Sequence, residues 1–176
     1  GPGLKNFCRE QHLDGDTLVW QDTQKLSLDE DILRPCADPF SAEGGLQLVS
    51  GNLGRAMVKV SAVDEEYHSI EAPAKVFQSQ RAFVDAFNND ELEQDFVAVL
   101  SCQGPRANGM PELHKLTPYL GVLQNRGFKV ALVTDGSMSG ASGKVLAAIQ
   151  VTPEALCGGL IAKVRDGDLI KVDATS

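Results

Sequence analysis

The stretch that decides the fold is residues 128–168, FKVALVTDGSMSGASGKVLAAIQVTPEALCGGLIAKVRDGD. Its first part, residues 128–133, is an apolar run that predicts a buried strand. A loop rich in glycine and serine follows from Thr134 to Lys144. Residues 145–149 are apolar again. A strand that leads into such a loop is a common place for ligand binding, because loop residues emerge at the carboxyl end of the strand.

The end of this stretch predicts a short helix and a hairpin. Thr152-Pro153-Glu154 has a capping residue, a proline and an acid in the order that starts a helix, and Gly158-Gly159 would end it. Asp166-Gly167 favours a two-residue hairpin turn, so residues 160–164 and 169–172 are predicted to pair.

Upstream, the sequence alternates between short strands and short helices. Strands are predicted over residues 17–20, 46–49, 57–63, 74–77 and 96–100. Helices are predicted over residues 27–33, 79–88 and 111–123, with Pro118 kinking or restarting the last one. Long, strictly alternating βα units are missing, so we expect an α/β fold with a mixed sheet or small β-barrel and flanking helices. Residues 1–45 are predicted to be a lead-in segment, and residues 46–176 the folded domain.

Composition excludes several classes of function. The chain has 176 residues, a net charge of −8 and a 43% hydrophobic share, which suits one soluble domain with a proper core. The acidic balance argues against a general nucleic-acid or anionic-membrane binder. No apolar run approaches a membrane span and no signal-peptide pattern is present, so a cytoplasmic location is expected.

The cysteines predict no metal or disulfide site within the chain. Cys8, Cys36, Cys102 and Cys157 are far apart, and no ligand spacing links them to the histidines. We interpret them as isolated thiols of a reducing compartment, with Cys102 an inert core thiol after the apolar run.

Two loops carry the residue types expected of a binding site. In the 134–144 loop, glycines let backbone amides approach an anion, and Lys144 adds a positive charge. It is not a P-loop, because Met138 and Val145 occupy two of that motif's required positions. In the second loop, Arg106 and Asn108 could clamp carboxylate or hydroxyl groups. A tight structural loop that uses glycine only for its backbone freedom remains an alternative for the first loop.

Several motifs in order resemble the C-terminal domain of the dihydroxy-acid/phosphogluconate dehydratases. They are GNLGRAMVKVSAV (51–63), IEAPAKVF (70–77), QGPRANGMPELHKLTPYLGVL (103–123), ALVTDGSMSGASGK (131–144) and VTPEALCGGLIAKVRDGDLIKVDA (151–174). The NGMPELHKLTP and SGASGK variants resemble the phosphogluconate dehydratase branch.

This resemblance implies a swivelling β/β/α barrel domain and a dehydration reaction. The substrate would be 6-phospho-D-gluconate and the product 2-dehydro-3-deoxy-6-phosphogluconate, in the Entner–Doudoroff route. A 4Fe–4S cluster would be held by an N-terminal domain absent from this sequence, so the chain alone would bind no metal and show little or no activity. The full-length enzyme would be a homodimer.

The resemblance also implies roles for individual residues. Ser139, the serine of the TDG-x-x-SG motif, would be the catalytic base. Residues predicted to bind the substrate are Asp135, Gly136, Gly140, Ser142, Lys144, Arg106 and Asn108. The sequence departs from the family pattern at Ser101 and Ser137, where arginine is usual, and at Leu146 and Gln150, where proline and histidine are usual. Gln103 stands where one branch has a magnesium-binding glutamate, so that ligand is not carried over.

Two alternatives stay open at this point. One is a related dihydroxy-acid or sugar-acid dehydratase. The other is a non-catalytic binding module of the same fold, which the two serines at arginine positions would favour.

Overall fold

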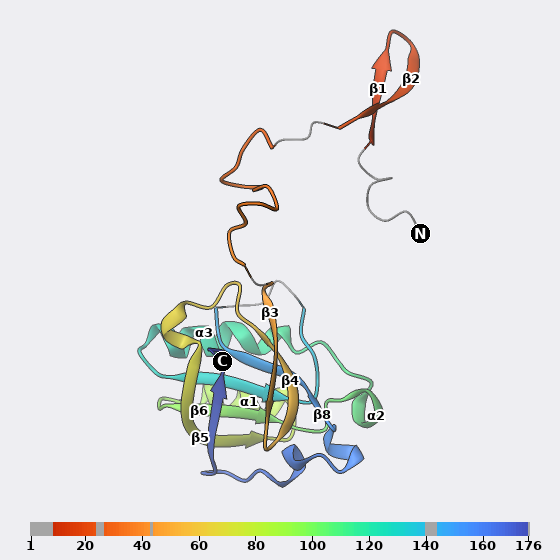
Figure 1. Ribbon diagram of the computed structural model, residues 1–176. Helices are drawn as coiled ribbons and strands as arrows, with labels where there is room; N and C mark the ends of the chain where they lie inside the picture. The colour runs from red at the N-terminus through yellow and green to blue at the C-terminus, as the bar shows by residue number, and fades with distance from the viewer. Residues whose placement is uncertain (1–8, 24–26, 43, 140–143, 176) are drawn as a thin grey trace. The chain divides into compact units, whose positions relative to one another are not determined.

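A computed structural model of the chain describes residues 9–23, 27–42, 44–139 and 144–175 (Figure 1). Its backbone separates into two compact units, Gly1–Glu43 and Gly44–Ser176. The first unit is small, and the second contains the main sheet and the helices.

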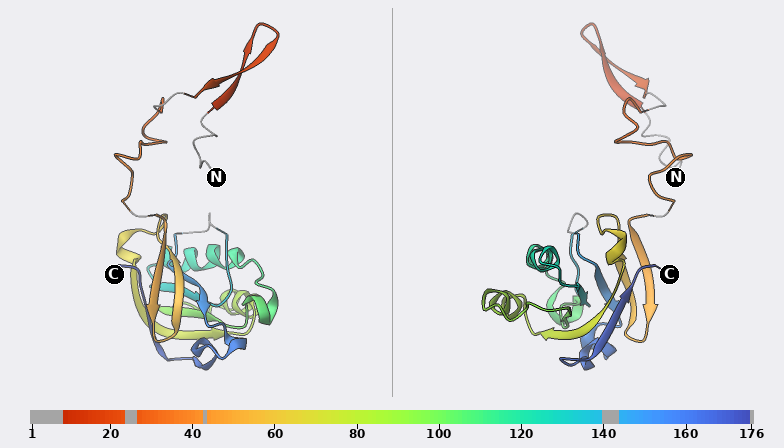
Figure 2. Two further views of the ribbon diagram at one scale, coloured as in Figure 1. Left: turned by 45° about the vertical axis from the view of Figure 1, so that its right-hand side comes forward. Right: turned by 90° about the vertical axis from the view of Figure 1, so that its left-hand side faces the viewer.

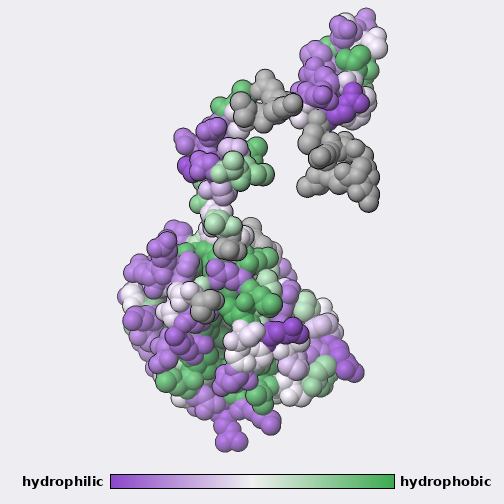
Figure 3. Space-filling view, in the orientation of Figure 1, coloured by the Kyte–Doolittle hydropathy of each residue, from purple (hydrophilic) through white to green (hydrophobic). Residues whose placement is uncertain are grey.

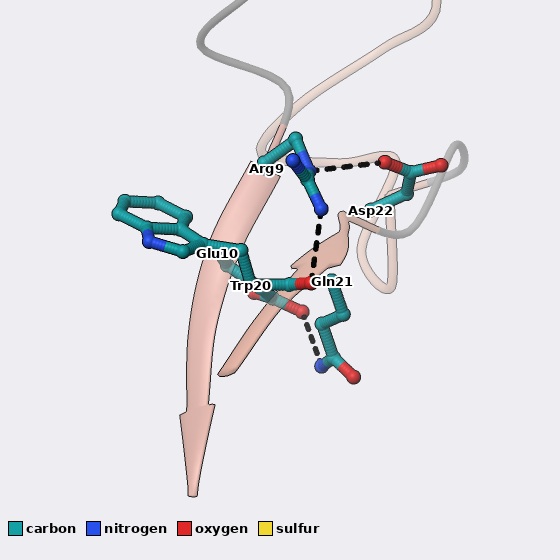
Figure 4. Close-up of polar contacts among 5 residues, drawn as sticks. All are labelled: Arg9, Glu10, Trp20, Gln21 and Asp22. Atoms are coloured by element: carbon teal, nitrogen blue, oxygen red, sulfur yellow. Dashed lines mark hydrogen bonds and ion pairs between the residues drawn. The ribbon is translucent and has the colours of Figure 1, made fainter. Parts of the chain in front are cut away.

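The first unit contains an antiparallel hairpin of β1 (Arg9–Asp14) and β2 (Thr17–Asp22). Gly15, with φ +62°, lies in the two-residue turn between the paired Asp14 and Thr17. Arg9 Nη2 donates to the carbonyl of Trp20 at 3.0 Å, and its Nε lies 3.6 Å from Asp22 Oδ1 (Figure 4). These contacts are solvent-exposed, so they contribute little to stability.

Residues 27–42 do not form the predicted helix. Ser27 Oγ accepts a hydrogen bond from the Asp29 amide at 3.1 Å and donates to the Asp29 carbonyl at 2.8 Å, which makes a local turn. Leu28 is 92% exposed, and Ile32 and Leu33 are exposed as well. The prediction was wrong because a single capped turn is not stable without an apolar face packed against a core.

The second unit is built on a seven-stranded mixed sheet with the order β3-β4-β8-β7-β6-β5-β9. Its strands are β3 (Leu46–Gly51), β4 (Gly54–Lys59), β5 (Ser69–Phe77), β6 (Phe96–Leu100), β7 (Val130–Thr134), β8 (Ala147–Thr152) and β9 (Leu169–Asp173). The central strands β5, β6, β7 and β8 are parallel, and the outer pairs are antiparallel. The sheet curls into a half-barrel (Figure 2).

Both faces of the central strands are buried. Along β6, Phe96, Ala98 and Leu100 belong to one apolar cluster, whereas Val97 and Val99 belong to another. The first cluster lies between the sheet and the helices, and the second lies inside the curl with residues of β4, β5 and β9. This double burial is why β6 and β7 read as continuous apolar runs in the sequence.

The helices are short, and α1 and α3 cover one face of the sheet (Figure 2). They are α1 (Gln80–Asn88), α2 (Pro105–Asn108) and α3 (Thr117–Asn125), with 3₁₀ turns η2 (Glu65–Tyr67), η3 (His114–Leu116), η4 (Ala155–Cys157) and η5 (Leu160–Lys163). The Ser79 side chain caps α1 by accepting from the Ala82 amide at 3.1 Å, as predicted. Pro118 lies in the first turn of α3, so it restarts the helix after η3.

The C-terminal hairpin predicted around Asp166-Gly167 does not form. Residues of the expected first strand make η5 instead, with Ile161 buried. β9 pairs with β5, which lets Ile170 and Val172 enter the cluster inside the curl. The pairing of β9 with β5 is more stable than the predicted hairpin because it buries apolar side chains that a solvent-exposed hairpin would leave in water.

The predicted fold class, a mixed α/β sheet with flanking helices, is confirmed.

Polar surface interrupted by apolar patches covers the face that carries β3, where Leu46 and Leu48 are exposed (Figure 3). Among the described residues, no helix is long and apolar enough to cross a membrane.

A core substitution tests the packing of the central strand. Leu132 in β7 is fully buried, whereas Leu169 in β9 is 68% exposed. We expect Leu132→Ala to lower the free energy of unfolding by about 3–5 kcal/mol and Leu169→Ala by less than about 1 kcal/mol. Urea unfolding measures both values. Equal effects would contradict the packing.

Candidate functional site

Three loops meet where the parallel strands end. Leu100 and Thr134, the last residues of β6 and β7, are paired in register, and β8 ends nearby at Thr152. The loops that follow these strands therefore emerge at one edge of the sheet. They contain both stretches that the sequence singles out, residues 103–110 and 134–139, together with residues 153–157.

A buried carboxylate ties these loops together. Asp135, which is 1% exposed, accepts hydrogen bonds from the amides of Cys102 at 3.1 Å, Gln103 at 2.8 Å and Ala155 at 2.9 Å. A buried charge is tolerated only when hydrogen bonds replace its hydration, and these three donors do so. Asp135, predicted from the resemblance to bind substrate, thus has its carboxylate engaged within the protein.

The backbone of Gly136 is also engaged. Its amide donates to Thr134 Oγ1 at 3.0 Å, and its carbonyl accepts from the Gln150 amide at 2.8 Å. A Cβ at this position would lie 2.7 Å from the Cβ of Gln103 and 2.9 Å from Leu113 Cδ1. Glycine is required here because the loop is packed against these side chains, and not because its backbone takes a positive φ.

Arg106 and Asn108 lie in the loop after β6, and both make hydrogen bonds within the protein. The Arg106 amide donates to both carboxylate oxygens of Glu154 at 3.2 Å, and its Nη1 donates to Cys157 Sγ at 3.4 Å. Asn108 Nδ2 donates to Gln103 Oε1 at 3.1 Å. Glu154 is packed against Gly104, where a Cβ would lie 1.8 Å from Glu154 Oε2.

A hollow of about 520 Å³ opens beside these residues. Its lining combines polar and apolar groups from all three loops: Pro105, Arg106, Met110, Asp135, Gln150, Val151, Thr152, Pro153, Glu154 and Cys157. The Arg106 guanidinium is its positively charged group, and Arg106 belongs to none of the ion pairs found among the described residues. The lining thus combines one cationic side chain, Arg106, with the carboxylates of Asp135 and Glu154.

Backbone strain is concentrated at this edge of the sheet. Cys102 (φ +61°), Met110 (φ +55°) and Gln150 (φ +55°) adopt the left-handed conformation that residues other than glycine rarely take. Such strain collects at functional sites, where neighbouring contacts hold it in place. The interpretation of Cys102 as a core thiol was wrong, because this residue is exposed at the start of the loop.

Ser139 follows Asp135 and Gly136 in the same loop, and its backbone is held by two other segments. Its amide donates to Glu112 Oε1 at 2.9 Å, and its carbonyl accepts from Lys59 Nζ. The segment is positioned by a bridge between Glu112 and Ser137 and by a bond from the Leu113 amide to the Ser137 carbonyl at 3.2 Å. Met138 is buried between these anchors.

The sequence did not identify Lys59 or Glu112 as site residues. Lys59 ends β4 and is 7% exposed. Burial lowers the pKa of its ammonium group, and the Glu112 carboxylate opposes this shift by raising the pKa. Period-two alternation places Lys59 with Met57 and Ser61, opposite Val58 and Val60, so the sequence alone favours a solvent-facing lysine.

The remaining predicted residues are not all at this edge. Lys144 is exposed, and its carbonyl accepts from Gln124 Nε2 near the end of α3 at 3.3 Å. Two residues after Lys144, the Leu146 carbonyl accepts a hydrogen bond from the Leu132 amide. Leu132 is in the middle of β7, so this part of the loop is not at the carboxyl end of the strand. Gly140 and Ser142 lie outside the described residues.

Ser137 and Gln150, two departures from the family pattern, contact each other. Gln150 Nε2 donates to Ser137 Oγ at 3.2 Å. Where the family usually has two basic residues, this chain has a neutral hydrogen-bonded pair.

The described residues do not assemble a metal centre. No group of three or more His, Cys, Asp or Glu side chains gathers within residues 9–23, 27–42, 44–139 and 144–175. The thiolate set that an iron–sulfur cluster requires is thus not formed by this part of the chain.

Replacing the buried carboxylate tests the loop junction. Asp135→Asn keeps the size of the side chain but loses the charge and one acceptor, so we expect the free energy of unfolding to fall by about 2–3 kcal/mol. Asp95→Asn is the control, because exposed Asp95 accepts one amide hydrogen bond, from Lys129 at 2.8 Å. Urea unfolding compares them, and equal losses would argue against the junction.

Known proteins are similar in sequence to this chain along its whole length. Residues 31–176 match the family model described as dihydroxy-acid/6-phosphogluconate dehydratase C-terminal. The chain is 61% identical to a phosphogluconate dehydratase of Pseudomonas aeruginosa, over 100% of the chain and 29% of that protein. It is 55% identical to a phosphogluconate dehydratase of Escherichia coli K12, over 98% of the chain and 29% of that protein.

A protein from the other branch is more distant. A dihydroxy-acid dehydratase of Sulfurisphaera tokodaii is 39% identical, over 98% of the chain and 32% of that protein. The chain thus spans less than a third of the length of these relatives, and the resemblance seen in the motifs is confirmed. This chain belongs to the dihydroxy-acid/6-phosphogluconate dehydratase family and corresponds to its C-terminal region.

Proposed function

We propose that this chain is the C-terminal domain of a hydro-lyase that converts 6-phospho-D-gluconate into 2-dehydro-3-deoxy-6-phosphogluconate in the Entner–Doudoroff pathway. The observation that carries the proposal is the 61% identity to a phosphogluconate dehydratase along the whole chain. The lower identity of 39% to a dihydroxy-acid dehydratase favours the phosphorylated sugar acid over a branched dihydroxy acid.

In this proposal Ser139 is the proton acceptor. The reaction removes a proton from the carbon next to the carboxylate and the hydroxyl from the following carbon, and the resulting enol tautomerises to the 2-keto acid. A serine hydroxyl can accept that proton only when it is held in place and its anionic form is stabilised. The contacts of Glu112 and Lys59 on the backbone of Ser139 support the first condition.

The hollow beside the strand ends would bind an anionic end of the substrate. Arg106 supplies a positive charge there, and Asn108 and Gln150 add amide groups nearby. Gly140, Ser142 and Lys144 remain proposed substrate contacts from the rest of the loop. For Asp135 and Gly136 we propose a positioning role, because their polar groups are occupied by other loop residues.

The rest of the enzyme would supply what the described residues do not assemble. A 4Fe–4S cluster in the N-terminal domain would act as the Lewis acid on the departing hydroxyl. We propose that the two domains close over the substrate, that the full-length protein is a homodimer and that it works in the cytoplasm. Because the chain spans 29% of its Pseudomonas relative, we expect no turnover from the chain alone.

The second candidate is a non-catalytic member of the family. Its support is the neutral pair of Ser137 and Gln150, which meet at 3.2 Å where the family pattern has basic side chains. Such a domain would keep the fold and the interface with the N-terminal domain but bind the substrate weakly.

A hybrid enzyme separates these candidates. This chain replaces the matching C-terminal region of the Pseudomonas relative, and dehydration of 6-phospho-D-gluconate and of a 2,3-dihydroxy acid is measured by keto-acid formation. We expect turnover of the phosphorylated substrate, and loss of about 10²–10⁴-fold in kcat for Ser139→Ala. Ser69→Ala, at the start of β5, is the matched control and should leave kcat unchanged.

Two results would overturn the proposal. A correctly folded, cluster-loaded hybrid without turnover would favour the non-catalytic module. Full turnover by the Ser139→Ala hybrid would remove Ser139 from the role of proton acceptor.

A further inference from the structure

Lys59 is an unusual residue to find buried. It ends β4, and at 7% exposure it is nearly as buried as the apolar side chains around it. Lysine is almost never buried unless its ammonium group is paired, because removing the charge from water is costly. Its position therefore needs an explanation beyond the packing of the sheet.

Lys59 contacts the loop that carries Ser139. Its Nζ donates to the Ser139 carbonyl, although the two residues are far apart in the sequence. The Ser139 amide donates to Glu112 Oε1 at 2.9 Å, and the His114 amide donates to the same oxygen at 2.8 Å. Both backbone polar groups of Ser139 are thus held by charged side chains from two other segments.

The two side chains also interact with each other. Glu112 raises the pKa of Lys59 while burial lowers it, so the carboxylate helps to keep the ammonium group charged. The pair follows the rule that a partly buried charge is accompanied by an opposite charge and by hydrogen bonds. Ser139 lies between them as a bridging residue.

We propose that Lys59 and Glu112 are positioning residues that clamp the backbone of Ser139 and so fix the direction in which its hydroxyl points. This inference rests on the proposed role of Ser139 in proton abstraction. A loop serine without such a clamp would sample several backbone conformations, and misplacement of a reacting group by about 1 Å can cost about 10²-fold in rate.

The clamp predicts a difference between two substitutions at one position. Glu112→Gln keeps an acceptor oxygen for the Ser139 and His114 amides, whereas Glu112→Ala removes it. Lys59→Met removes both the donor and the charge while keeping a long apolar side chain. Lys75→Met is the matched control, because Lys75 Nζ also donates to a backbone carbonyl, that of Glu91, outside the candidate site.

Amide hydrogen exchange of the chain itself tests the clamp without catalysis. We expect Lys59→Met and Glu112→Ala to speed exchange of the Ser139 amide at least tenfold, with a smaller change for Glu112→Gln and none for Lys75→Met. Exchange of the Val99 amide in buried β6 should stay slow in every variant, which shows that the fold is intact. If Lys59→Met fails to fold, the exchange rates of the two Glu112 variants test the clamp. Unchanged Ser139 exchange in the folded variants would overturn the clamp.

Kinetics of the hybrid enzyme provide the second readout. Lys59→Met and Glu112→Ala should lower kcat at least tenfold with KM changed less than about twofold, and Glu112→Gln should retain more of kcat. Faster Ser139 exchange combined with an unmodified kcat would overturn the positioning role. A hybrid that never turns over, combined with the exchange changes above, would refute the proposed function while leaving the clamp in place.

Discussion

The carboxylate of Asp135 lies at the end of β7 and accepts amide hydrogen bonds from Cys102, Gln103 and Ala155. Cys102 and Gln103 belong to the loop after β6 and Ala155 to the segment after β8, so one side chain from the loop after β7 sets the spacing of all three segments. Because the carboxylate is 1% exposed, loss of any donor would leave part of a charge without water. The strained backbone of Cys102 and Gln150 can persist only while such contacts hold the loops in place.

A second polar arrangement begins a few residues further along the same loop. There the charges come from Lys59 and Glu112, and they act on the backbone of Ser139. The loop is thus anchored at both ends of its described part, at Asp135 and at Ser139, with buried Met138 between them. Anchoring of this kind gives a reactive hydroxyl a fixed position before substrate arrives, which is where preorganised sites gain their advantage.

The sequence predicted the core of the fold well, because burial leaves a direct pattern. The apolar runs of β6 and β7 and the cap at Ser79 correspond to observed elements, whereas β4 ends at Lys59 instead of continuing to residue 63 as predicted. The failures occurred where tertiary contacts override local signals. Asp166-Gly167 favours a hairpin locally, yet β9 pairs with β5, and the residues after Ser27 form a local turn in place of the predicted helix.

The candidate site was predicted less completely, for a related reason. Motif resemblance pointed to Ser139 and to the loop around it, but hydrogen bonds formed between distant segments cannot be inferred from residue spacing. Asp135 reads as a loop acid in the sequence and is a buried junction in the structure. Lys59 reads as a solvent-facing lysine on a half-buried strand, and only the fold shows its ammonium group at the backbone of Ser139.

The most direct measurement is a crystal structure of the hybrid enzyme with 6-phospho-D-gluconate bound. We predict that Ser139 Oγ lies about 3–3.5 Å from the carbon next to the substrate carboxylate, the separation of a near-attack geometry. Lys59 and Glu112 should keep their contacts with the Ser139 backbone in that complex. A substrate whose reacting carbon lies beside a different acceptor, with Ser139 turned away, would contradict the account.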